Sequence, residues 1–114
     1  MLHIRIGNTT FCAVPAQNES AAALMELLAD GPITIRAENY GGFEKVGSLP
    51  RKLPQRDTCM TTVPGDVMLY QGDSIVFFYG SNTWAYTPLA AIREDRDRLR
   101  QAFGGTETTV TLFR

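Results

Sequence analysis

Short segments in which apolar and polar residues alternate dominate this chain, and they predict strands. Residues 2–6 alternate leucine and isoleucine with histidine and arginine, as expected of a strand with one buried face. The glycine and asparagine at 7–8 suit a tight hairpin turn. Similar segments follow, each bounded by turn residues. We therefore predict strands at 2–6, 9–14, 33–38, 67–70, 74–79, 84–87, 89–92 and 106–113, with a further short strand around 58–63.

Two segments carry the spacing of amphipathic helices instead. Within 19–29, Ala21, Leu24, Met25 and Leu28 fall on one helical face, and a Gly-Pro pair stops the helix at 31–32. Asn18 or Ser20 can cap its start. The second predicted helix, 96–103, follows a dense run of charges that indicates a solvated face. Within that run, Glu94 and Arg98 have the spacing of a helical ion pair.

One strand and one long segment depart from these patterns. Residues 75–78 are apolar without alternation, which indicates burial on both faces. Residues 47–64 contain three prolines and a basic cluster, so we predict a long loop. Leu49 and Leu53 are its expected anchors.

Many short strands with only two helices favour a mainly β fold, either a small barrel or a sandwich. In a barrel, the two helices would close the open ends. A chain of 114 residues with 44% hydrophobic content predicts one domain, 1–114, with a core that needs neither disulfide nor metal.

Composition excludes several classes of function. Eleven basic and twelve acidic residues give a formal net charge of -1, which argues against nucleic-acid binding. No apolar run reaches membrane-spanning length and the N-terminus lacks a signal-peptide core, so we expect a soluble cytoplasmic protein. Cys12 and Cys59 lack metal spacing, and no cofactor motif is present. Buried, inert cysteines are favoured over a catalytic pair with His3, which stays an alternative.

The order of these elements and four motifs resemble the cyclophilin-like superfamily, and especially its small bacterial single-domain proteins. The motifs are Asn39–Lys45, Leu49–Leu53, Gly65–Tyr70 and Ile75–Gly80. The resemblance spans nearly the whole chain. It implies a closed eight-stranded β-barrel with a helix over each end.

The chain departs from the resemblance where true cyclophilins perform catalysis. Their Phe-His-Arg strand corresponds here to residues 33–38, with Glu38 near the position of the catalytic arginine and Arg36 two residues away on the same strand face. Prolyl isomerisation needs a donor aimed at the amide nitrogen, for which Arg36 and Arg51 are the candidates. Phe43, Phe77 or Phe78 would supply an apolar wall. We expect this activity to be absent or very weak.

The glycine pair at 41–42 marks the candidate site, because glycines permit a tight turn and aromatic, amide and charged residues surround them. The favoured hypothesis is a module that binds a peptide or a small molecule there. Tyrosine and tryptophan offer large contact areas with a polar tip, and arginine offers a bidentate fork. The candidate ligand-binding residues are Asn39, Tyr40, Glu44, Lys45, Arg51, Tyr79, Trp84 and Tyr86.

Other interpretations stay open at this point. The aromatic residues would instead pack at the barrel ends, and Glu44 and Lys45 would form a weak surface ion pair. A hydrolase would use paired carboxylates, Glu38 with Glu44 or Asp66 with Asp73, although no nucleophile motif accompanies them. In a larger assembly, exposed parts of 76–79 would form an interface. The oligomeric state cannot be predicted from these patterns.

Overall fold

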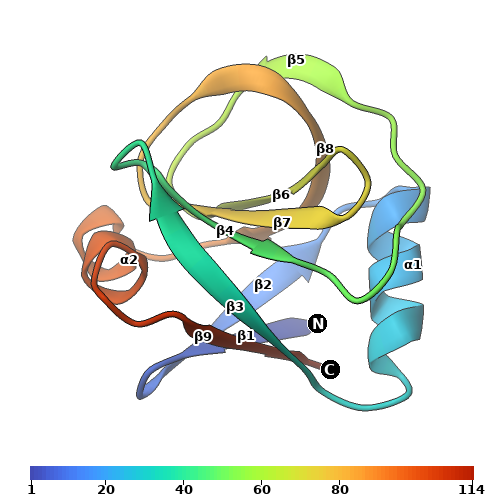
Figure 1. The fold of residues 1–114 in the computed structure, drawn as a ribbon, viewed down its shortest axis with the longest axis horizontal. Helices are drawn as coiled ribbons and strands as arrows, with labels where there is room; N and C mark the ends of the chain where they lie inside the picture. The colour runs from blue at the N-terminus through green and yellow to red at the C-terminus, as the bar shows by residue number, and fades with distance from the viewer.

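The alternating segments form a closed antiparallel β-barrel of eight strands (Figure 1), in a computed structural model that describes all residues 1–114. Neighbouring strands follow the order β2-β1-β9-β3-β4-β7-β6-β8, and pairing of β2 with β8 closes the barrel. A ninth strand, β5, pairs only with β8. The elements are β1 (Leu2–Ile6), β2 (Thr9–Pro15), α1 (Glu19–Leu28), β3 (Ile33–Tyr40), β4 (Glu44–Ser48), β5 (Thr58–Thr61), β6 (Asp66–Tyr70), β7 (Ser74–Phe78), β8 (Thr83–Ile92), α2 (Arg96–Phe103) and β9 (Thr109–Phe113).

The predicted barrel and its two helices are confirmed, but four strand assignments were wrong. β9 begins at Thr109, three residues after its predicted start. β3 runs two residues beyond its predicted end, and β4 was not predicted as a strand. The two pieces predicted on either side of Pro88 are one strand, β8. The pairing of β8 with β6 shifts register next to Pro88, and such irregularities are where proline is tolerated in a sheet.

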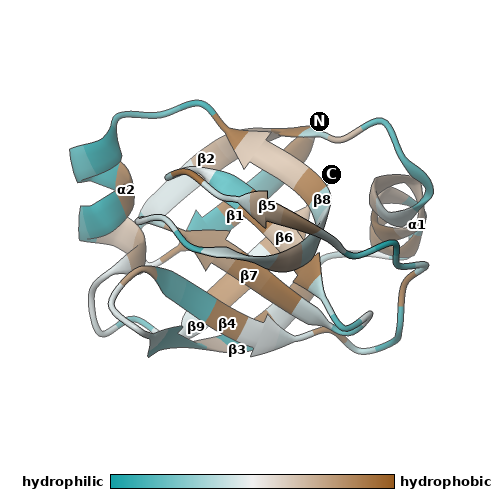
Figure 2. Cartoon of the chain, turned by 90° about the horizontal axis from the view of Figure 1, so that it is seen from above, coloured by the Kyte–Doolittle hydropathy of each residue, from teal (hydrophilic) through white to brown (hydrophobic).

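The two helices lie at opposite ends of the barrel (Figure 2). Asn18 caps α1 by accepting a hydrogen bond from the Ala21 N–H at 2.8 Å, and its amide donates to the Pro88 carbonyl at 2.8 Å. At the other end, the Phe103 ring of α2 stacks on Phe11 and Phe77, with centroid distances of 5.5 and 5.3 Å. Both helices therefore contribute side chains to the barrel core.

The charged and loop segments behave as predicted. Residues 93–98 are exposed, and Arg98 pairs with Glu94 at 2.7 Å. Leu49 and Leu53 are buried, and their N–H groups donate to carbonyls of the β6–β7 turn at 2.8 Å each. The helices have ten and eight residues, and neither is long and apolar enough to cross a membrane.

The central strand β7 is buried on both faces, as its unbroken apolar run predicts. Ile75 and Phe77 point into the barrel core. Val76 and Phe78 point outward and join Met68 and Tyr86 in a second buried cluster. Since all of Val76–Tyr79 is buried, the hypothesis that this segment forms an exposed interface is wrong. The outer face of the sheet thus carries its own apolar floor.

Candidate functional site

The turn between β3 and β4 is fixed by its glycines. Gly41 and Gly42 have φ angles of 65° and 72°, the left-handed region that glycine favours. The Phe43 ring packs so closely on Gly41 that a Cβ there would lie 2.2 Å from it. The Phe43 carbonyl accepts hydrogen bonds from the N–H groups of Tyr79 and Gly80 at 3.0 and 2.9 Å. The hairpin tip is therefore held against the connection between β7 and β8.

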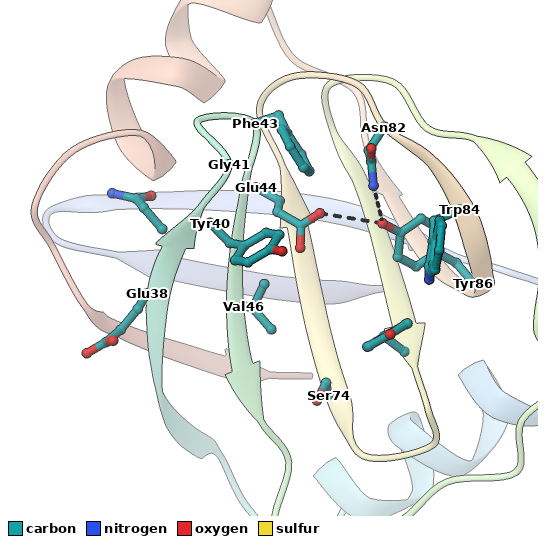
Figure 3. Close-up of a pocket in the computed structure, with 12 residues that line it drawn as sticks. Glu38, Tyr40, Gly41, Phe43, Glu44, Val46, Ser74, Asn82, Trp84 and Tyr86 are labelled. Carbon is teal, nitrogen blue, oxygen red and sulfur yellow. Dashed lines mark hydrogen bonds between the residues drawn. The ribbon is translucent and has the colours of Figure 1, made fainter.

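A cavity of about 960 Å³ opens between this hairpin and the start of β8, over the outer face of the sheet (Figure 3). Strand alternation explains which side chains reach it, because every second residue of β3 and β4 points outward. The residues that line the cavity come from β3, β4, β6, β7, β8 and their connections. They are Glu38, Asn39, Tyr40, Gly41, Phe43, Glu44, Val46, Tyr70, Ser74, Asn82, Trp84 and Tyr86.

Glu44 is the buried carboxylate of this cavity, with 6% of its surface exposed. The Tyr86 hydroxyl donates to its Oε1 over a long 3.5 Å, and the Asn82 amide donates to the Tyr86 oxygen at 2.8 Å. Burial raises the pKa of Glu44 to about 7, and the hydrogen bond from Tyr86 opposes that rise. The second carboxylate oxygen, Oε2, has no hydrogen-bond partner and is not sealed from solvent; it points into the cavity in Figure 3.

Aromatic rings form the walls and the rim. Tyr40 and Trp84 are exposed by 66% and 59% on opposite sides of the cavity. The rings of Phe43 and Tyr40 pack edge to face, with their centroids 6.2 Å apart, and the ring centroids of Tyr86 and Tyr70 are 6.0 Å apart. The interpretation that the aromatic candidates pack at the barrel ends is therefore wrong for Tyr40 and Trp84. Two broad, exposed rings flank an apolar floor.

The structure brings together five of the eight predicted binding residues: Asn39, Tyr40, Glu44, Trp84 and Tyr86. Tyr79 does not line the cavity. It is buried, and its hydroxyl donates to Asn39 Oδ1 at 3.0 Å. The Asn39 amide in turn donates to the Gly105 carbonyl at 2.9 Å, so the two residues support the cavity from behind.

Lys45 also lies behind the cavity, and the interpretation of a surface ion pair with Glu44 is wrong. Its side chain is fully buried on the opposite face of β4. The ammonium group donates to the carbonyls of Glu107 and Gly105 at 2.5 and 3.3 Å. Burial lowers the pKa of Lys45, while the charges of Glu107 and Glu38 raise it. Lys45 thus ties β4 to the connection between α2 and β9.

The two candidate arginines lie outside the cavity. Arg36 is exposed on the same strand face as Glu38, as predicted, and pairs with it at 3.0 Å. Arg51 is exposed in the loop after β4. No arginine, lysine or histidine lines the cavity, so it lacks a guanidinium that could reach a bound amide.

Several lining residues were not among the predicted binding residues. Val46 was not predicted because β4 was not predicted as a strand; Val46 lies two residues after Glu44 and therefore on the same face of β4. Tyr70 and Ser74 flank the turn between β6 and β7, and Asn82 precedes β8. Their approach to the hairpin depends on barrel closure, which no local pattern reveals.

Of the remaining candidate chemistry, only the carboxylate pair of Glu38 and Glu44 lies at this cavity. Cys12 and Cys59 are both exposed, so the prediction that they are buried is wrong. Cys12 Sγ lies 3.5 Å from His3 Nδ1 across β1 and β2, but neither residue lines the cavity. Asp66 is the first residue of β6, whereas Asp73 follows the other end of that strand, in the turn before β7, so the two are not a pair. No group of three or more histidine, cysteine or acidic residues is placed to hold a metal ion.

A family model described as the cyclophilin-like family matches residues 4–112, which is nearly the entire barrel. No curated protein matches the chain.

Proposed function

The chain belongs to the cyclophilin-like family, and from that premise we propose that it is a binding module for a small molecule or a short peptide segment. The proposed site is the cavity between the β3–β4 hairpin and the start of β8. One observation carries the proposal: a cavity outside the barrel core combines exposed aromatic rings with a buried carboxylate that is open to it. Concave, mostly apolar sites with a few polar groups are the usual form of ligand pockets.

Energetic cost supports this interpretation. Leaving the Tyr40 and Trp84 rings in water forgoes the stabilisation that their burial would give. Burying the Glu44 carboxyl with one long hydrogen bond costs further stability. Unfavourable arrangements of this kind are common at functional sites.

The lining favours binding over prolyl isomerisation. The resemblance to true cyclophilins suggests an arginine that stabilises the twisting amide, but the cavity has no cationic side chain. Glu38, the residue near that position, carries the opposite charge and pairs with Arg36. Ligand binding requires only the apolar, aromatic and carboxylate groups that line the cavity.

Trp84 makes the proposal directly testable, because it is the chain's single tryptophan and lies at the cavity. A library of small metabolites and short peptides is screened by tryptophan fluorescence and by thermal shift. A ligand that binds the native state raises the melting temperature and changes the Trp84 emission. The matched control is Val14→Ala, which removes an exposed apolar side chain from β2 outside the cavity.

Variants then assign the site. We expect Tyr40→Ala to weaken binding of a hit about tenfold or more, since stacked aromatic contacts contribute roughly 1–3 kcal/mol. Val14→Ala should bind like the native chain. Hits whose affinity is the same in both variants, or a library without any hit, would overturn the proposal.

A further inference from the structure

We infer that the ligand of this cavity carries a cationic group, an ammonium or guanidinium on an apolar body, and that Glu44 pairs with that group. The inference rests on the proposed function and narrows it to a chemical class. It joins three independent features: the charges around the cavity, the free oxygen of Glu44 and the placement of the rings.

The charged residues that line the cavity are Glu38 and Glu44, both acidic. Neighbouring cations are engaged elsewhere. Lys45 directs its ammonium to carbonyls behind the sheet, and Arg36 pairs with Glu38, so Glu44 is the lining carboxylate without a cationic partner. An anionic ligand would therefore meet the uncompensated charge of an ionised Glu44, at the energetic cost of like charges.

Glu44 presents a buried acceptor with unused capacity. An ionised carboxylate accepts hydrogen bonds at both oxygens, but Glu44 receives one, from Tyr86 to Oε1. The residue is 94% buried, and Oε2 has no protein donor although it is open to the cavity. A ligand ammonium or guanidinium would supply the donor and the neutralising charge together.

The aromatic rings suit the same group. The faces of tyrosine and tryptophan rings attract organic cations, and the apolar part of such a ligand packs against them. Tyr40 and Trp84 stand on two sides of the space into which Glu44 Oε2 points (Figure 3). A cation between them would contact a carboxylate and ring faces, while its apolar body would lie over Val46 and Tyr70.

Proton linkage gives an additional signature. Burial holds the pKa of Glu44 at about 7, so an ammonium that needs the ionised form competes with a proton. The groups that face Glu44 are Tyr86, which donates to it, Tyr79 behind it, and Glu38, Tyr40 and Tyr70 around the cavity. Ionisation of Glu44 should raise amine affinity about tenfold between about pH 6 and pH 8.

The test compares probes of matched shape by Trp84 fluorescence at about pH 8. The small-molecule arm uses phenylethylamine, neutral phenylethanol and anionic phenylacetate. The peptide arm uses acetyl-lysine amide, in which the acetyl group caps the α-nitrogen, and the same compound with norleucine in place of lysine. We expect the cationic member of each arm to bind about tenfold more tightly than its neutral partner. The arm that binds more tightly distinguishes a free amine from a lysine side chain.

Two variants assign the preference to Glu44. Glu44→Gln keeps the shape and removes the charge, so the preference for the cation should fall below about threefold and its pH dependence should vanish. Glu26→Gln is the matched control, because Glu26 is an exposed carboxylate on α1 that does not line the cavity, and this variant should keep both. The thermal melting temperature of each variant verifies folding.

Each outcome has a defined meaning. Equal binding of cationic and neutral probes, a preference for phenylacetate, or a cation preference that survives Glu44→Gln overturns the inference and leaves the proposed function standing. Absence of binding by these probes and by the wider library overturns both.

Discussion

Replacing Glu44 with glutamine should change how the free energy of unfolding depends on pH. In the unfolded chain the Glu44 carboxyl has its ordinary pKa of 4.5, and burial raises this to about 7 in the folded protein. The folded state therefore binds the proton more tightly. The resulting stabilisation is fully present below about pH 4.5 and is lost as the pH rises through about 7.

The expected magnitude follows from the size of the shift. One pKa unit corresponds to about 1.4 kcal/mol, so the rise from 4.5 to about 7 corresponds to roughly 3 kcal/mol. The native chain should lose about that much stability from Glu44 alone between about pH 4 and pH 8. Glutamine does not titrate, so Glu44→Gln should lack this loss and become relatively more stable as the pH rises. Burial also raises the pKa of Asp66, but Asp66 is present in both proteins and its effect cancels in their difference.

Urea denaturation, followed by circular dichroism at several pH values, measures this difference. Glu38→Gln is the control: it removes an exposed carboxylate and a surface ion pair, which contributes at most about 1 kcal/mol. Parallel pH profiles for the native chain and Glu44→Gln would refute the reasoning, because they would mean that Glu44 is ionised equally easily in both states.

Three further perturbations test other parts of the description. Lys45→Met leaves the Gly105 and Glu107 carbonyls without their donor and should destabilise the fold by about 1–3 kcal/mol in urea denaturation; an unchanged midpoint would contradict the described contacts. Gly41→Ala should cost more than about 1 kcal/mol and more than Gly42→Ala, because both positions have positive φ but only Gly41 lacks room for a Cβ; equal costs would argue against the ring contact. A proline-peptide assay should detect no turnover above the uncatalysed rate, and robust turnover abolished by Arg36→Ala or Arg51→Ala would reverse the preference for a binding function.

Most of the barrel was predictable because its strands show local patterns of apolar and polar residues. Residues 2–6 alternate cleanly, and the apolar run at 75–78 correctly indicated a strand covered on both faces. The motifs from Asn39 to Gly80 then supplied the barrel topology through their resemblance to a family, which the match over 4–112 confirms. Local pattern alone left barrel and sandwich unresolved.

The failures concern residues whose surroundings are made by distant parts of the chain. Glu44 and Lys45 read as surface charges, so β4 was missed. Glu44 is covered in fact by Tyr86 and its neighbours on the outer face, and the acceptors of Lys45 lie 62 and 60 positions away, at Glu107 and Gly105. Tyr70 and Asn82 reach the cavity for the same reason. Sequence spacing does not reveal such encounters, because barrel closure creates them.

The single partner of β5 has a mechanical consequence. β4, β7 and β6 each have hydrogen-bonded neighbours on both sides, whereas the β5–β8 ribbon beside Trp84 ends in a free edge. Bending that ribbon disrupts fewer bonds than bending the central strands. The cavity thus combines a stiff base with one compliant side, which would let the proposed site accept ligands of different size.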